Sequence, residues 1–116
     1  MTPDQQRGPM KHMVPVCAIA AFLLGNVAAL AASKTILQKG KVFSETEIVI
    51  AKGDTINFVN DDTVTHNVMS KSPGNEFNIG AQAPGVSAPV TFGAVGTANI
   101  ICAIHPQMRM NVKITN

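Results

Sequence analysis

Short segments with alternating apolar and polar residues, separated by turns, make up the chain from residue 34 onward. The last of them alternates Met110, Val112 and Ile114 with polar residues, and residues 56–60 alternate in the same way. A period of two is typical of strands with one buried face. Some segments show this alternation, and others are short and rich in β-branched or aromatic residues. On these two criteria we predict strands at residues 34–38, 48–50, 56–60, 64–68, 77–79, 90–92, 99–102 and 110–115. No helical period is long enough to predict a helix there.

Turn-forming sequences stand between these segments. Lys52-Gly53-Asp54, Asn60-Asp61-Asp62 and Ser72-Pro73-Gly74-Asn75 are examples, and residues 80–89 are also rich in turn formers. Short strands separated by turn signals at intervals of about 8–12 residues predict an all-β protein, an antiparallel β-sandwich.

The first 31 residues differ in character from the rest. Residues 1–11 are polar and include Arg7 and Lys11, residues 13–30 are mostly apolar, and Ala29-Leu30-Ala31 forms an A-x-A site. This layout predicts a signal peptide over residues 1–31, cleaved after Ala31, and an exported, periplasmic protein. An uncleaved membrane anchor is the alternative, and only then would the protein contact a membrane. Small residues and an asparagine within the apolar part favour cleavage.

Removing this segment leaves residues 32–116, enough for one small domain and too few for two. Seven basic and six acidic side chains remain, so the net charge is close to zero. There is no basic stripe and no aromatic stacking platform, which argues against a nucleic-acid partner. The near-neutral charge also gives no strong field that would identify a protein partner.

The remaining chain has one cysteine, Cys102, and two histidines, His66 and His105. An exported protein usually carries paired cysteines, so a single thiol needs an explanation. Cys102 could be buried and inert, could pair between chains, or could bind a metal as the thiolate. Its position three residues before His105 favours the metal.

The run from Cys102 to Met108 places a thiolate, an imidazole and a thioether within seven residues. Thiolate and thioether favour Cu(I), whereas imidazole binds either oxidation state of copper. Two histidines, one cysteine and a nearby methionine are the parts of a blue-copper electron-transfer site, so we expect one copper ion that cycles between Cu(I) and Cu(II). A hydrolase with a Cys-His pair is less well supported, because no oxyanion donors or orienting carboxylate are apparent near Cys102.

The chain resembles the cupredoxins, and most closely the amicyanin and plastocyanin group. The matching positions run through residues 34–115 in order: Lys52-Gly53-Asp54 before a strand, the Asn60-Asp61 corner, His66-Asn67-Val68, and Cys102-x-x-His105 followed by methionine and a last strand. Each motif alone is weak, but their order is specific. The resemblance implies a Greek-key sandwich, with His66, Cys102, His105 and one methionine as copper ligands.

Met108 and Met110 compete for the axial position. Met108 lies three residues after His105, the spacing of amicyanins, and Met110 lies five after it, the spacing of plastocyanins and pseudoazurins. We favour Met108, because Met110 falls on the last strand, where a thioether can pack in the core or at the rim of the site. Asn67 resembles the residue beside the ligands that braces the ligand loops in this family. Ala103 and Ile104 depart from the family pattern, and Ala103 lacks the hydroxyl that would partner Asn67.

These observations predict a one-electron carrier rather than an enzyme, because the protein supplies every ligand position. A redox partner protein would dock at the partly exposed edge of His105. Pro106, Met110 and Ala83-Pro84 could form an apolar rim around that edge, or they could be ordinary loop residues, and the sequence favours neither. We expect a monomer. The main alternative is a chaperone or storage protein that delivers copper in the periplasm, and a sandwich that binds zinc or no metal is a third.

Overall fold

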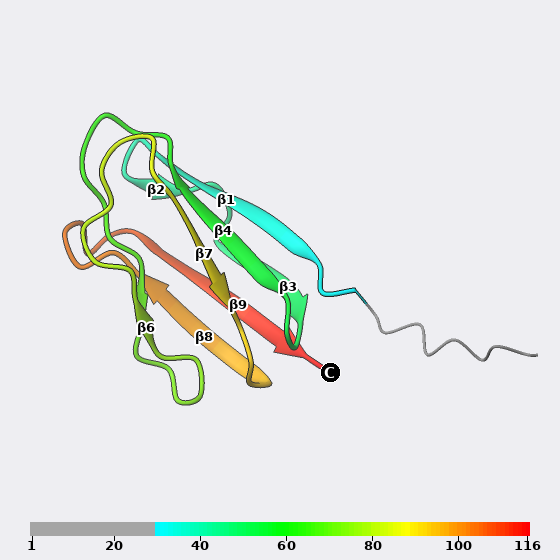
Figure 1. Ribbon diagram of the computed structural model, residues 1–116. Coiled ribbons are helices and arrows are strands. Elements are labelled where there is room, and N and C mark those ends of the chain that lie inside the picture. Colours follow the sequence, from blue (N-terminus) through cyan, green and yellow to red (C-terminus); the bar gives the residue numbers. More distant parts are fainter. Residues whose placement is uncertain (1–29) are drawn as a thin grey trace, which may run out of the picture.

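Two β-sheets packed face to face form the part of the chain that the computed structural model describes, residues 30–116 (Figure 1). One sheet has four strands in the order β2-β1-β4-β7, and the other has five in the order β3-β9-β8-β5-β6. The strands are β1 (Ser33–Lys39), β2 (Val42–Phe43), β3 (Glu47–Ala51), β4 (Thr55–Asn60), β5 (Met69–Ser70), β6 (Phe77–Asn78), β7 (Ser87–Thr91), β8 (Gly96–Ile101) and β9 (Arg109–Thr115).

The all-β sandwich expected from the sequence is confirmed, but its sheets are mixed. β1 pairs with β4 in parallel, and β3 pairs with β9 in parallel, whereas the other pairings are antiparallel. A parallel pairing joins strands that are distant in sequence, so no local turn signal reveals it.

The core lies between the two sheets and follows the predicted alternation. Met110, Val112 and Ile114 of β9 are buried, while Asn111 and Lys113 between them are exposed. Phe58 of β4 is fully buried and lies within 6.4 Å, ring centre to ring centre, of Phe43 and Phe77. This apolar layer fixes the two sheets relative to each other and thereby positions the loops at their ends.

One predicted strand is absent from the structure, and one strand of the structure was not predicted. Residues 64–68 do not form a strand: His66 makes only an isolated antiparallel bridge to Gln82, and the next strand, β5, begins at Met69. A two-residue strand that the pattern did not indicate, β2, pairs with β1 across a turn in which both Gly40 and Lys41 have positive φ. Two such residues between paired strands are the geometry of a type I′ hairpin.

Candidate metal centre

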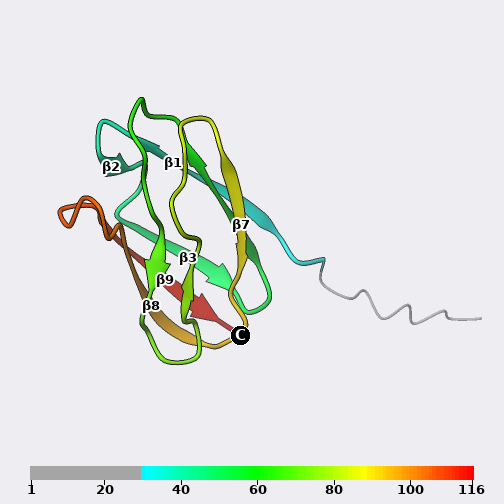
Figure 2. The ribbon, with the colours of Figure 1, turned by 60° about the vertical axis from the view of Figure 1, so that its left-hand side comes forward.

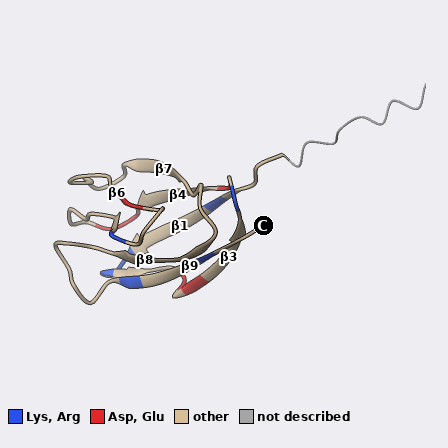
Figure 3. Cartoon of the chain, turned by 90° about the horizontal axis from the view of Figure 1, so that it is seen from below, with Lys and Arg blue, Asp and Glu red and all other residues tan. Residues whose placement is uncertain are grey.

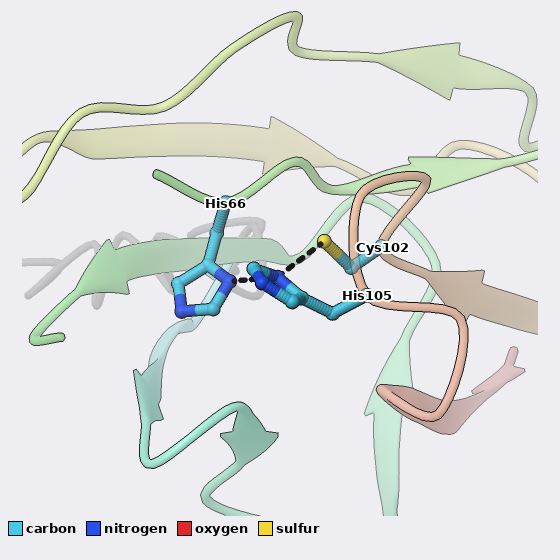
Figure 4. Close-up of side chains that lie close together, drawn as sticks. All are labelled: His66, Cys102 and His105. Carbon is cyan, nitrogen blue, oxygen red and sulfur yellow. Dashed lines mark hydrogen bonds between the residues drawn. The ribbon is translucent and has the colours of Figure 1, made fainter. Parts of the chain in front are cut away.

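Three donor side chains from two loops meet at one end of the sandwich (Figure 4). His66 lies in the connection between β4 and β5, while Cys102 and His105 lie in the loop between β8 and β9. The two Nδ1 atoms are 3.1 Å apart, and the Cys102 Sγ is 3.9 Å from the His105 Nδ1. The three donor atoms all lie within 4.8 Å of one another. The structure therefore brings together residues that are up to 39 positions apart.

The spacing of these atoms suits a single metal ion. Nitrogen and sulfur ligands about 2.0–2.3 Å from a tetrahedral metal lie about 3–4 Å from one another. His66 and Cys102 are buried, and His105 is half-buried. One ion could thus be bound by all three with small side-chain adjustments, shielded from water except at His105.

The ring of His66 is oriented by a carboxylate on its far side. The Nε2 of His66 is 2.9 Å from the Asp62 carboxylate. The backbone amide of Lys41, the hydrogen bond from His66 and the amide of Thr63 lower the pKa of Asp62 from 3.8 to about 2. Because the ionised carboxylate can only accept, Nε2 donates the proton in this bond. In the neutral ring that binds a metal, Nδ1 is then the atom left to coordinate the ion.

Buried amide side chains hold the loop that carries Asp62 and His66. Asn60, fully buried at the end of β4, donates from Nδ2 to the carbonyls of Val64 and Gln82, and its Oδ1 accepts the amide of Asp62. The backbones of His66 and Gln82 exchange two hydrogen bonds of 2.7 and 3.0 Å. The segment is therefore fixed by side chain to backbone bonds rather than by a regular ladder, which explains why residues 64–68 are not a strand.

Asn67 links the two ligand loops. Its backbone amide lies 3.3 Å from the Cys102 Sγ, and its Oδ1 accepts the backbone N–H of Ala103 at 3.2 Å. Its Nδ2 donates to Asn78 Oδ1 and to the carbonyl of Gly80. The hydroxyl that Ala103 lacks is thus replaced by the backbone of the same residue. Asn67 binds the cysteine, its loop and the β6 region at once.

The two methionines occupy different places. Met108 is buried in the ligand loop, where its carbonyl accepts the amide of Cys102 and its amide donates to the carbonyl of His105. Met110 is buried on β9, where it pairs with Ile100 of β8. Met110 is only 2% exposed, so of its two expected places, core and rim, it occupies the core and does not contribute to an apolar rim around His105. The other candidate rim residues, Pro106 and Ala83-Pro84, are exposed.

Sequence reasoning did not identify Asp62 or Gln82. Asp62 lies in a turn-forming sequence. Its position four residues before His66 was the one feature of the sequence that could have indicated a contact with that ring. Gln82 lies in a turn-rich stretch where nothing predicted a buried side chain, yet it is 2% exposed. Its Nε2 donates to the carbonyls of Phe58 and Val86, and its Oε1 accepts from Gln38. Both residues act through contacts that exist only in the folded chain.

Comparison with solved structures identifies cupredoxin folds. A purple cupredoxin from Nitrosopumilus maritimus matches with a TM-score of 0.63 and 22% identity over 71% of this chain and 99% of its own. An amicyanin variant in the Cu(I) form matches with a TM-score of 0.66 and 20% identity, over 71% of this chain and 81% of its own. The copper-containing nitrite reductase of Thermus scotoductus matches with a TM-score of 0.67 and 23% identity. The match covers 72% of this chain but only 22% of the reductase. No curated protein sequence matches.

These structural similarities show the fold alone. A match to a sequence-family model shows the family as well. The model for copper-binding proteins of the plastocyanin/azurin family matches residues 31–115, which include every strand but none of the first 30 residues. No helix within residues 30–116 is long and apolar enough to cross a membrane. Together with the cluster of His66, Cys102 and His105, the match over the whole sandwich shows that the chain belongs to the plastocyanin/azurin family of copper-binding proteins.

Proposed function

We propose that this protein is an exported one-electron carrier that binds one copper ion through His66, Cys102, His105 and, axially, Met108. The observation that carries the proposal is the arrangement of the three donors: they lie together, two buried and one at the surface. Bound copper would supply the change between Cu(II) and Cu(I). No substrate position is left open when the protein supplies all four ligands, which argues against an enzyme.

The surrounding chain limits how far the donors move when the oxidation state changes. Asp62 fixes the ring of His66, and the amide of Asn67 donates to the sulfur of Cys102. The bonds of Met108 to Cys102 and His105 close the ligand loop on itself. A site with little movement between its two states favours fast electron exchange.

Electrons would enter and leave at His105, the half-buried ligand. Exposed apolar residues lie in its loop and in the neighbouring one: Ile104, which is 49% exposed, Pro106, and Ala83-Pro84. Basic and acidic positions alternate with uncharged ones along the strands and loops of the sandwich (Figure 3), and the charge of residues 32–116 is near neutral. A redox partner would therefore dock by apolar contact rather than by strong electrostatic steering, with the carrier as a monomer.

The signal peptide, residues 1–31, would direct export, and its cleavage after Ala31 would release residues 32–116 in the periplasm. Ala31 and Leu30 are exposed ahead of β1, so this peptide bond is accessible to a protease.

The test is to add Cu(II) to the purified protein and record its visible spectrum. We expect an intense thiolate-to-copper charge-transfer band that is abolished by Cys102→Ser and by His66→Ala. Copper bound without this band would refute the assignment. Met108→Leu should shift the reduction potential, while Met110→Leu, its matched control in the core, should leave it nearly unchanged; the reverse would make Met110 the axial ligand.

The copper-delivery alternative is separated by a second measurement. A carrier should keep its copper through repeated oxidation and reduction and exchange electrons with a small redox protein. Transfer of Cu(I) from the reduced protein to an acceptor peptide rich in cysteine, faster than electron exchange, would instead identify a delivery protein.

A further inference from the structure

Asp54 is a buried carboxylate without a cationic partner among residues 30–116. Its exposed fraction is 8%, and neither of the two ion pairs in this part of the chain includes it. Oδ2 accepts the amide of Ala51 and Oδ1 accepts the amide of Ala32, each at 2.9 Å. Carboxylates in proteins are seldom buried unless a positive charge accompanies them.

The carboxylate is held firmly in place. The backbone amide of Asp54 donates to the carbonyl of Ala51, and its carbonyl accepts the amide of Phe92. Two lysines lie on the segments next to Asp54, and both are exposed. Lys52 is in the turn before Asp54, and Lys34 of β1 donates to the carbonyl of Val49 rather than to Asp54. The carboxylate of Asp54 is thus held next to the Ala32 nitrogen and could pair with a positive charge on that atom.

Ala32 is the residue at which the described chain joins the sandwich. Its nitrogen binds Asp54, and its carbonyl accepts the amide of Thr55 at 3.0 Å. Leu30 is 93% exposed, and Ala31 is exposed as well. The A-x-A sequence therefore ends one residue before the first backbone hydrogen bonds to the domain.

We propose that Asp54 is a binding site for the new N-terminus: cleavage between Ala31 and Ala32 converts the Ala32 nitrogen into an α-ammonium group that pairs with this carboxylate. The inference rests on the proposed cleavage. A signal peptidase adds water across the peptide bond, leaving a carboxylate on Ala31 and an amine on Ala32. The amine takes up a proton at neutral pH, because α-amino groups have a pKa of about 7.7–8.0.

The existing geometry already suits the ion pair. The Ala32 nitrogen is 2.9 Å from Oδ1, within the range of a charge-assisted hydrogen bond. The pair would join the start of β1, in the four-stranded sheet, to the turn after β3, in the five-stranded sheet. Cleavage after Ala31 would then stabilise the folded domain that it releases. The ion pair would lie at the start of β4, whereas His66 follows the end of that strand.

The first experiment expresses the full 116-residue chain in a bacterium that exports it and measures the intact mass of the product. We expect a chain that begins at Ala32. Retention of residues 1–31, or cleavage at another bond, would overturn the proposal.

The second experiment asks whether the charge on Ala32 matters. The exported product is acetylated on its α-amine in urea at pH 6.5, where lysines react little, then refolded, and the unfolding equilibrium is measured in urea. Acetylation should raise the unfolding constant about five- to tenfold. In Asp54→Asn it should raise that constant less than twofold. The control Asp61→Asn, which removes an exposed carboxylate 3.9 Å from Lys39, should respond like the unsubstituted protein.

An equal response in Asp54→Asn and in the unsubstituted protein, or no response in either, would overturn the ion pair. If Asp54→Asn does not fold, the α-amine of the unsubstituted protein should be acetylated at least tenfold more slowly in the folded state than in urea, and equal rates would overturn the pair. The copper band should be the same before and after acetylation. Its absence would count against the proposed function and not against this inference.

Discussion

Gln38 and Gln82 form a buried pair whose two members should differ sharply in their contribution to stability. Both side chains are almost completely buried, and the Gln38 Nε2 donates to the Gln82 Oε1. Gln82 makes two further bonds, to the carbonyls of Phe58 and Val86. The Gln38 Oε1 has no hydrogen-bond partner among residues 30–116. We predict that replacement by methionine, which is similarly long and unbranched, is costly at one position and nearly neutral at the other.

The magnitudes follow from counting these bonds. Gln82→Met removes three hydrogen bonds, each contributing about 1 kcal/mol, so we expect a loss of about 3 kcal/mol. Gln38→Met removes one bond and leaves the Gln82 oxygen without a partner, but it also removes an acceptor that is already unpaired. These terms nearly cancel, and the free energy of unfolding should change by less than about 1 kcal/mol.

Urea unfolding of the metal-free protein measures both variants, with an unchanged m-value as the check that each unfolds like the original. Gln107→Met, at an exposed position of the ligand loop, is the control for methionine itself and should have almost no effect. A loss of 2 kcal/mol or more for Gln38→Met would refute the reasoning, because the Gln38 oxygen would then have a partner in solution.

Three further predictions concern the fold and the loop beside the site. Phe58→Ala should cost about 3–5 kcal/mol in urea unfolding, because the ring is fully buried, and a loss below 1 kcal/mol would contradict this. Gly74→Ala should destabilise more than Gly85→Ala, since both have φ near +82° but only at Gly74 would the new Cβ lie 2.9 Å from Ala94; equal losses would be unexpected. Asp62→Asn should destabilise the metal-free protein at pH 6. The fold lowers the pKa of Asp62 from 3.8 to about 2, so this stabilisation is present above pH 4 and declines as the pH falls toward 2. The urea midpoints of the protein and the variant should therefore differ by a constant amount above pH 4 and converge as the pH falls from 4 toward 2.

The sequence predicted what depends on local pattern. Alternation in β9 placed Met110 in the core, and the order of His66, Cys102 and His105 indicated the cluster. Alternation misled at residues 64–68, because the Asn60 side chain donates to the carbonyl of Val64 and accepts the amide of Asp62, which leaves no ladder for that backbone. The parallel pairings and the buried amides of Gln38 and Gln82 are long-range contacts, for which a local pattern carries no signal.

Both ends of the sandwich's chain lie away from the candidate copper ligands. The Thr55 amide binds Ala32 and the Lys52 amide binds Thr115, which brings the two ends to the same side, while the loops with His66 and His105 lie at the other (Figures 1 and 2). A tether attached at either end would therefore point the His105 edge outward. The domain could be fused to an enzyme or immobilised on an electrode through either end without covering the His105 edge, the surface proposed for electron exchange.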